Sequence, residues 1–188
     1  MNKYLIVGLG NIGAEYENTR HNIGFLIADR LGEKLSANFK SSNFGQLCET
    51  SYKGRKTLII KPDTYMNLSG NAVNFWINKE NIKLKNILIL CDDLSLPFGT
   101  LRMKSKGSSA GHNGLKSIEI SLQTQQYPRL RFGIGNDFIK GQQIDYVMDT
   151  WREEEQLILK ERVDFSAEAV KSFIFAGINN TMNEFNGK

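Results

Sequence analysis

Two histidines occur in this chain of 188 residues, and each is followed directly by asparagine. One pair is His21-Asn22 and the other is His112-Asn113. A neutral imidazole can accept a proton near neutral pH, because its unperturbed pKa is about 6.5. A side-chain amide offers a donor and an acceptor without carrying charge. Together, such residues can activate a water molecule and hold a polar, uncharged substrate.

His21 needs a partner before it can be interpreted as a base. A lone histidine in such a polar stretch is more often a surface or capping residue than a catalyst. A carboxylate beside one ring nitrogen would fix the tautomer that leaves the other nitrogen free to take a proton. Asp92, at the end of a buried apolar run, is the natural candidate, and Asp93 is its competitor. A strand-end aspartate could also merely cap a loop, so the sequence leaves this choice open.

Asn11 lies in a glycine-rich turn, Gly8-Leu9-Gly10-Asn11-Ile12-Gly13, that follows a predicted strand. The spacing matches the dinucleotide-binding fingerprint, which also requires a helix at the third glycine and an acidic residue about 20 residues later. A polar stretch follows instead, and the nearest acidic candidate, Asp29, falls inside a predicted helix. We therefore expect a tight turn that presents Asn11 at the carboxyl edge of the sheet, where open α/β sheets bind ligands.

Two further asparagines occur in loops with turn-forming or apolar neighbours. Asn67 follows Tyr65-Met66, which would form an apolar wall beside an amide aimed into a cleft. Alternatively, Asn67 caps the next helix, a position that asparagine favours. Asn113 lies between Gly111 and Gly114, where a substrate backbone could approach closely, or where the chain simply begins a helix. Each structural alternative is reasonable singly, but the amides together indicate one polar site along a sheet edge.

Composition restricts the class of protein. Hydrophobic residues make up 40% of the chain and charged residues 23%, as in ordinary globular domains. The sequence shows no secretory signal and no apolar run of the roughly 20 residues that span a bilayer, so we expect a cytoplasmic protein without membrane contact. Two separated cysteines provide no disulfide framework, and with two histidines they make a structural zinc site improbable.

Positive charge is concentrated in one segment. Residues 99–131 contain six basic side chains and a single acidic one, whereas the formal charge of the whole chain is only +4. This segment is a candidate phosphate-binding face. A solvated surface with scattered lysines is the alternative. The basic residues are Arg102, Lys104, Lys106, Lys116, Arg129 and Arg131.

Strands and helices alternate along the chain, which favours an α/β three-layer sandwich with one domain over residues 1–188. A hairpin predicted near residues 45–61 makes the sheet mixed and twisted, with helices on its flanks. Further strands are predicted at 4–9, 87–90, 100–104 and 130–134. Helices are predicted at about 22–36, 68–78 and 115–122, then a long amphipathic helix that includes 159–174, and a short one at 178–185.

The motifs taken together resemble the bacterial-type peptidyl-tRNA hydrolases. The order and spacing match to about residue 150, and the combination is far more specific than any single motif. The matching segments are Leu5-Ile6-Val7-Gly8-Leu9-Gly10-Asn11, Glu15-Tyr16 through Thr19-Arg20-His21-Asn22-Ile23-Gly24-Phe25, Lys61-Pro62 through Gly70, Asp92-Asp93-Leu94 with Leu96-Pro97-Phe98-Gly99, Ser109 through Lys116, and Arg129 through Gly135.

This resemblance implies a monomeric enzyme that hydrolyses the ester between a peptide and the 3′ ribose of tRNA without a metal or cofactor. It assigns His21 as general base, Asp92 as its orienting carboxylate, and Asn11 as the residue that helps to distinguish N-blocked from free aminoacyl-tRNA. The other implied contacts with the peptide or with the acceptor stem and 3′ CCA end are Tyr16, Tyr65, Asn67, Asn113, Lys104 and Arg131.

The chain departs from the family pattern in three places. Ile12 replaces the usual proline, and Ser95 replaces an acidic residue. Lys106-Gly107-Ser108 contains fewer glycines than the glycine-rich stretch of the family pattern. None removes a residue with an implied chemical role. We expect direct attack of water on the ester, with an oxyanion donor from Asn67 or Asn113, and a loop over residues 95–112 that could gate the site. Two alternatives are a non-catalytic RNA-binding protein on the same fold and a small-molecule esterase or amidase, although no G-x-S-x-G or reactive-cysteine motif is present.

Overall fold

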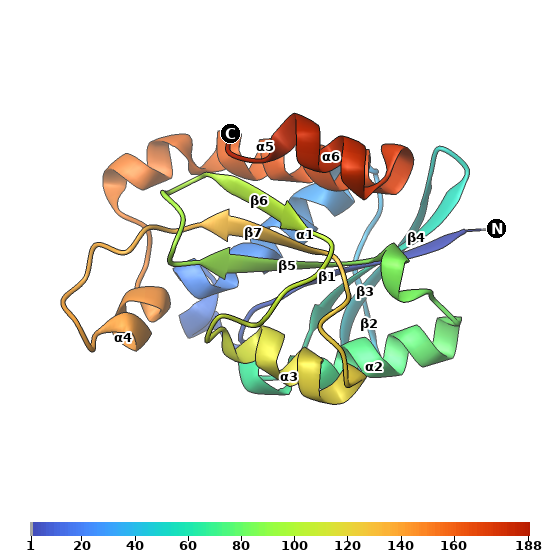
Figure 1. The fold of residues 1–188 in the computed structure, drawn as a ribbon, viewed down its shortest axis with the longest axis horizontal. Helices are drawn as coiled ribbons and strands as arrows, with labels where there is room; N and C mark the ends of the chain where they lie inside the picture. Colours follow the sequence, from blue (N-terminus) through green and yellow to red (C-terminus); the bar gives the residue numbers. More distant parts are fainter. Residues whose placement is uncertain (1) are drawn as a thin grey trace.

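The computed structural model describes residues 2–188, and one sheet of seven strands organises them (Figure 1). The strand order is β2-β3-β4-β1-β5-β7-β6, with β1, β4, β5 and β7 parallel and the remaining strands antiparallel. The mixed sheet expected from the sequence is confirmed. The strands are β1 (Lys3–Gly8), β2 (Lys40–Ser42), β3 (Gly45–Tyr52), β4 (Arg55–Pro62), β5 (Ile87–Asp93), β6 (Leu101–Lys104) and β7 (Arg129–Gly133).

Helices cover both faces of this sheet and complete the three-layer sandwich (Figure 1). On one face lie α1 (Ile23–Lys34), α5 (Glu153–Ala176) and α6 (Ile178–Phe185); on the other lie α2 (Ser69–Glu80) and α3 (Asn113–Leu122). Short 3-10 turns η1 (Ala14–Tyr16), η2 (Arg20–Asn22), η3 (Met66–Leu68) and η4 (Leu84–Asn86) connect the elements. No helix within residues 2–188 is long and apolar enough to cross a membrane.

The two cores follow directly from the alternation of side chains along the central strands. Successive residues of a strand point to opposite faces, so Ile6 joins the core beneath α1 and α5, whereas Leu5 and Val7 join the core beneath α2 and α3. Strand β5 is buried over its whole length, as its unbroken apolar run predicts.

Two elements were not anticipated. The short edge strand β2 and the six-residue helix α4 (Gln143–Met148) carry too little apolar periodicity to be recognised in the sequence. The predicted strands and helices are otherwise present, with boundaries that shift by a few residues. Helix α5 begins at Glu153, several residues before the apolar pattern becomes clear. Helix α4 turns out to matter, because it lies beside the site described next.

Candidate active site

The carboxyl ends of the four parallel strands meet at one edge of the sheet, and the loops that follow them supply the polar residues of the site. Asn11 follows β1, Met66 follows β4, and Asp92 stands near the end of β5. His21 comes from η2, just before α1. The third glycine of the G-x-G-x-x-G run, Gly13, opens only a short 3-10 turn, so the tight turn expected around Asn11 is observed and a dinucleotide-binding helix is not.

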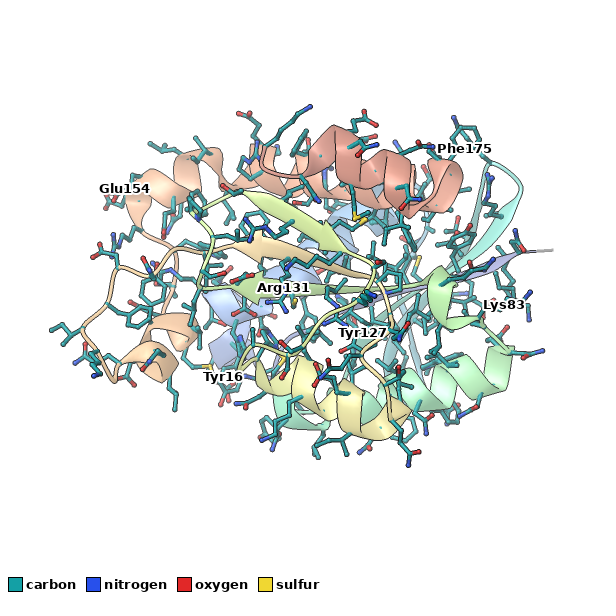
Figure 2. The ribbon with its side chains drawn as sticks, viewed as in Figure 1. Tyr16, Lys83, Tyr127, Arg131, Glu154 and Phe175 are labelled. Carbon is teal, nitrogen blue, oxygen red and sulfur yellow. The ribbon has the colours of Figure 1, made fainter. Side chains whose placement is uncertain are left out.

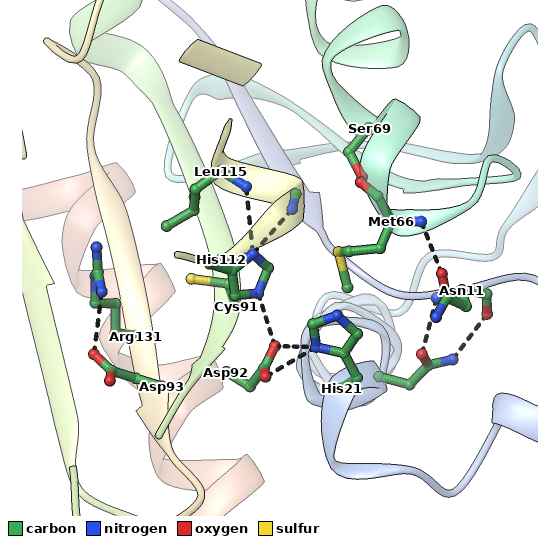
Figure 3. Close-up of polar contacts among 12 residues, drawn as sticks. Asn11, His21, Met66, Ser69, Cys91, Asp92, Asp93, His112, Leu115 and Arg131 are labelled. Carbon is green, nitrogen blue, oxygen red and sulfur yellow. Dashed lines mark hydrogen bonds and ion pairs between the residues drawn. The ribbon is translucent and has the colours of Figure 1, made fainter. Parts of the chain in front are cut away.

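His21 and Asp92 form a buried hydrogen-bonded pair (Figure 3). His21 Nδ1 lies 2.9 Å from both Asp92 Oδ1 and Asp92 Oδ2. The side chain of Asp92 is only 4% exposed and that of His21 only 11%. Because Asp92 carries acceptors only, His21 Nδ1 is the donor, and Nε2 is left unprotonated in the neutral ring. The structure therefore brings together the base and carboxylate that the sequence suggested.

Two glycines make this approach possible. A Cβ on Gly24, in the first turn of α1, would lie 2.5 Å from the carbonyl oxygen of Leu90 in β5. A Cβ on Gly8, the last residue of β1, would lie 2.3 Å from the carbonyl oxygen of Gly24. Any side chain at either position would force the helix away from the sheet. The glycines thus let the start of α1 rest against β1 and β5, which places His21 beside Asp92.

Asp93, the competing carboxylate, bonds to Ser95 and Arg131 and not to His21. Its Oδ1 accepts hydrogen bonds from the backbone amide of Ser95 at 2.8 Å and from Ser95 Oγ at 2.6 Å, and its Oδ2 lies 3.3 Å from Arg131 Nη1. The pleat of β5 explains the division, because neighbouring residues point to opposite faces of the sheet. Asp92 faces His21, and Asp93 stabilises its own loop and Arg131.

His112 is a second partner of Asp92, and the sequence did not assign it a chemical role. His112 Nε2 lies 2.9 Å from Asp92 Oδ1, while Nδ1 accepts hydrogen bonds from the backbone amides of Gly114 and Leu115 at 3.1 and 3.3 Å (Figure 3). His112 therefore caps α3 with one nitrogen and donates to Asp92 with the other. The signal available in the sequence was its place in the second of the two His-Asn dipeptides.

The pair shifts the titration of both members in the directions a base requires. Burial alone would lower the pKa of His21, but the charge of Asp92 and the hydrogen bond to it outweigh burial and raise that pKa. Burial alone would raise the pKa of Asp92, but His21 and His112 more than offset it and hold the pKa well below its usual range. Asp92 is therefore ionised at neutral pH and favours the protonated imidazole that proton abstraction creates.

Asn11 is 5% exposed and is held from two directions (Figure 3). Its Oδ1 accepts from the backbone amide of Met66 at 2.7 Å, which ties the loop after β1 to the loop after β4. Asn22 clamps the backbone of Asn11, because Asn22 Oδ1 accepts from its amide and Asn22 Nδ2 donates to its carbonyl, both at 2.9 Å. Within residues 2–188, Asn11 Nδ2 has only the weak acceptor Sδ of Met148 at 3.7 Å, so this donor remains available to a better acceptor.

A cavity of about 250 Å³ opens in front of the histidine pair. His21, Asp92 and His112 contribute to its lining, as does Asn113 at the start of α3. Helix α4 supplies more of the lining through Gln143, Ile144 and Val147, residues that the sequence reasoning had not identified. A second and larger cavity, about 510 Å³, lies on the other side of Asn11 and Asn22, beside α1 and the end of β4.

Several predicted contact residues lie outside the first cavity. Asn67 is exposed within η3, is not part of the lining of either cavity, and does not cap α2, whose N-cap is Leu68. Tyr65 is 54% exposed, and Tyr16 lies half-buried in η1 at the end of the sheet opposite to Lys83 (Figure 2). None of these three side chains contributes to the lining of the cavity in front of the histidines.

The basic segment divides into buried and exposed residues. Arg129 is fully buried and donates to the backbone carbonyls of residues 107, 108, 125 and 127, so it supports the loop before His112 rather than facing solvent. Arg131, half-buried, pairs with Asp93 and donates to the carbonyl of Ser108 at 2.8 Å. Lys104 is exposed on the edge strand β6. The expectation of six solvent-facing basic groups is therefore wrong for Arg129.

The donor atoms of His21, Asp92 and His112 lie within 4.8 Å of one another, which is close enough to test as a metal site. A histidine that ligates a metal normally donates its second N–H to a neighbouring acceptor. His112 Nδ1 instead faces two backbone N–H donors, so binding a metal through Nε2 would require the ring to lose both protons. The hydrogen-bond pattern suits proton transfer better than metal coordination.

The sequence relationship is equally definite. The family model for peptidyl-tRNA hydrolase matches residues 5–188. The chain belongs to the peptidyl-tRNA hydrolase family. The peptidyl-tRNA hydrolase of Bacteroides fragilis is 57% identical over 186 residues, covering 99% of this chain and 100% of the relative. That of Clostridium botulinum is 42% identical over 187 residues, covering 98% and 96%. The family expected from the motifs is confirmed.

A solved structure supports the same assignment. The crystal structure of the peptidyl-tRNA hydrolase from Acinetobacter baumannii superposes with a TM-score of 0.92 at 33% identity, covering 98% of this chain and 95% of that one. The peptidyl-tRNA hydrolase fold predicted from the sequence is therefore confirmed, including the final helices beyond residue 150, where the motif resemblance had ended.

Proposed function

We propose that this chain hydrolyses the ester bond that joins a peptide to the 3′ ribose of tRNA. The activity is a carboxylic ester hydrolysis, with water as nucleophile and His21 as general base. We also propose that the protein acts as a monomeric, single-domain enzyme in the cytoplasm, without a metal or organic cofactor. The single observation that carries the proposal is the buried His21–Asp92 pair at 2.9 Å, opening onto a cavity lined with amide groups.

The chemistry follows from the protonation states of this pair. His21 Nε2 takes a proton from water as the water oxygen attacks the ester carbonyl carbon. The proton then moves from the imidazolium to the leaving ribose oxygen as the C–O bond breaks, which leaves the base as it began. Asp92 stabilises the imidazolium between these two transfers, and His112 holds Asp92 in place from its other side.

Asn113 is the better of the two candidate oxyanion donors. It is exposed at the first position of α3 and lines the cavity together with His21 and Asp92, whereas Asn67 lies outside that lining. An amide donor aimed at the developing oxyanion is typically worth about 10²–10³ in rate. The remaining role proposed for Asn67 is contact with the peptide at the rim, beside Tyr65 and Tyr16.

A covalent route through the nearest thiol is disfavoured. Cys91 precedes Asp92 in β5, but its side chain is buried between the sheet and the helices. Burial raises the pKa of the Cys91 thiol to about 12, so almost none is present as the nucleophilic thiolate at neutral pH. This supports direct attack by water.

We assign the tRNA phosphates to the outer face of β6 and β7. The register of this antiparallel pair sets Arg102 opposite Arg131 and Lys104 opposite Arg129, so all four side chains share one face. Lys104 and Arg102 are exposed, whereas Arg131 keeps part of its surface free beside its bonds to Asp93 and Ser108. Positive side chains in this arrangement attract a phosphate backbone irrespective of base sequence.

The decisive experiment measures release of N-acetyl-amino acid from N-acetyl-aminoacyl-tRNA by the purified protein. Free aminoacyl-tRNA, the His21→Ala variant and an added chelator are run in parallel. We expect cleavage of the blocked substrate alone, loss of cleavage in the variant, and no effect of the chelator.

Each arm can contradict one part of the proposal. Salt-sensitive tRNA binding without hydrolysis would replace the enzyme with a non-catalytic RNA-binding protein on the same fold. Full activity in His21→Ala would remove the base assignment. Inhibition by the chelator, reversed by added metal, would overturn metal independence. Equal cleavage of blocked and free aminoacyl-tRNA would contradict the discriminating role of Asn11.

A further inference from the structure

Arg20, the residue before His21, is the least expected charged group in the core. Its side chain is 1% exposed although it carries a guanidinium. Nη2 donates to Glu155 Oε2 at 2.9 Å, and Nη1 donates to the carbonyl of Tyr146 at 3.4 Å. The guanidinium carbon lies 4.4 Å from the centre of the Tyr146 ring and 5.7 Å from that of Trp151. Arg20 thus points away from His21, toward α4 and the start of α5.

Helix α4 meets the core mainly through Tyr146, with Val147 partly buried beside it. Tyr146 is the buried residue of this six-residue helix, and Ile144 is 74% exposed. The Tyr146 ring packs against both the Arg20 guanidinium and the Phe138 ring, and its hydroxyl donates to the carbonyl of Ile134 at 2.6 Å. Removing the guanidinium would take away one of the two side chains that pack against the Tyr146 ring and leave Phe138.

The same helix forms part of the cavity in front of the histidines. Gln143, Ile144 and Val147 line that cavity, and Met148 Sδ lies against the Asn11 amide. The position of α4 therefore determines the width of the cavity and the access to the Asn11 donor. Figure 1 shows α4 near the strand ends, joined to β7 by a long connection and to α5 by a short one.

The backbone around Arg20 reinforces the link. The Arg20 amide donates to the carbonyl of Asp149 at 3.1 Å, and Thr19 forms an isolated antiparallel bridge with Thr150. Glu155, the ion-pair partner, also accepts from the Arg152 amide at 2.8 Å and so caps α5. Arg20 is thereby bonded to the end of α4, to the connection that follows and to the first turn of α5.

We propose that Arg20 is a positioning residue for substrate binding, which fixes α4 as a wall of the cavity through the Tyr146 ring. This inference rests on the proposed hydrolase function, because the cavity is taken to hold the substrate. Arg20 does not touch the His21–Asp92 pair with its side chain. Loosening α4 should therefore weaken substrate binding while leaving the proton transfer itself almost unchanged.

The test compares Arg20→Lys and Tyr146→Leu with the wild type in steady-state hydrolysis of N-acetyl-aminoacyl-tRNA. Lysine keeps a positive charge for Glu155 but loses the planar face and the second donor. Leucine removes the stacked ring without leaving a buried charge unpaired. We expect KM to rise at least about fivefold in both variants, kcat to stay within about threefold, and the midpoint of the pH profile to be unchanged. Arg30→Lys, a remote ion-paired arginine on α1, is the matched control and should alter neither constant.

A merely structural role would give a different pattern. Partial unfolding removes active molecules, so it lowers kcat without changing KM. Hydrogen exchange provides an independent measurement, in which the amides of residues 143–148 should exchange faster in both variants. An unchanged KM with unchanged exchange in α4 would overturn the inference. Failure of the wild type to cleave the substrate would contradict the proposed function instead, and the exchange measurement would still decide whether Arg20 anchors α4.

Discussion

The two His-Asn dipeptides look alike in the sequence, yet the structure uses them in opposite ways. In the first, His21 has one nitrogen bound to Asp92 and the other free, while Asn22 is 1% exposed and clamps the backbone of Asn11. In the second, His112 has both nitrogens engaged, and Asn113 is exposed in the cavity. The first pair contains the proposed base and a structural amide; the second contains a structural histidine and an available amide.

The difference arises from where each dipeptide sits relative to a helix. His21-Asn22 belongs to a 3-10 turn whose residues are all buried against the strand ends. His112 is the N-cap of α3, where the first backbone N–H groups of the helix have no partner within the helix. Two of these N–H groups donate to His112 Nδ1, so that Nε2 is directed at Asp92. Residue type therefore limits what a side chain can do, and backbone context decides which option is used.

The largest expected effect separates the two histidines. His21→Ala should lower kcat at least about a hundredfold, because general base catalysis is typically worth about 10²–10⁴. His112→Asn should lower kcat only about tenfold, because asparagine still caps α3 while the bond to Asp92 is lost. Single-turnover hydrolysis of blocked aminoacyl-tRNA measures both. Equal losses in the two variants would contradict the division of roles.

Asp92→Asn removes the carboxylate charge of the side chain to which both histidines are hydrogen-bonded. Without the carboxylate charge, burial dominates at His21 and lowers its pKa, so the protonated ring becomes neutral at a lower pH. In the wild type, kcat/KM should rise with pH and level off above a midpoint that exceeds 6.5, the ordinary histidine value. In the variant, the rise should move to lower pH, and the plateau should fall about 10- to 100-fold. A midpoint that stays fixed would mean that another group controls the profile.

Asn22 and Asn113 should contribute to different quantities, Asn22 to the free energy of unfolding and Asn113 to kcat/KM. Asn22→Ala leaves the backbone amide and carbonyl of Asn11 unpaired, which should lower the free energy of unfolding by about 1–3 kcal/mol. Asn113→Ala should change that free energy by less than about 0.5 kcal/mol while lowering kcat/KM about tenfold or more. Urea denaturation and steady-state kinetics give the two quantities, with the exposed Asn38→Ala as control. A destabilised Asn113→Ala protein with normal kinetics would reverse the comparison.

The smallest effect is expected on the phosphate face. Lys104→Ala should weaken tRNA binding a few-fold and reduce the slope of log affinity against log salt by about 0.7–0.9, the value for one phosphate contact. Lys83→Ala, which removes an equally exposed lysine at the far end of the sheet, should leave the slope unchanged (Figure 2). Filter binding at several salt concentrations makes the measurement, and identical slopes for both variants would place the phosphate contacts elsewhere.

Much of the site could be predicted because it is built from strand ends. An apolar run such as Ile87–Leu90 identifies a central strand, and any polar residue directly after it must lie at the carboxyl edge of a parallel sheet. That reasoning reached Asn11 and Asp92, and it located His21 just before a helix. It failed for α4, because a six-residue helix with one buried side chain leaves no periodic pattern to detect.

Only the tertiary structure could distinguish the roles of nearby residues of the same chemical type. The sequence favoured Asp92 and left Asp93 as its competitor, and the direction of the β5 pleat assigned Asp92 to His21 and Asp93 to Arg131. Likewise, six basic residues in one segment indicated a positively charged surface. They did not reveal that Arg129 is buried and donates to backbone carbonyls of the loop that it supports.

By itself the sequence determined the alternation of strands and helices, the family, and the residue types available for chemistry, because these depend on local pattern and order along the chain. Tertiary structure alone decided which partners each histidine nitrogen has, which carboxylate pairs with His21, and that Arg20 packs against Tyr146 of the helix beside the cavity. Those outcomes depend on contacts between segments that are as many as 135 residues apart, as for Arg20 and Glu155, and local pattern contains no information about such distances.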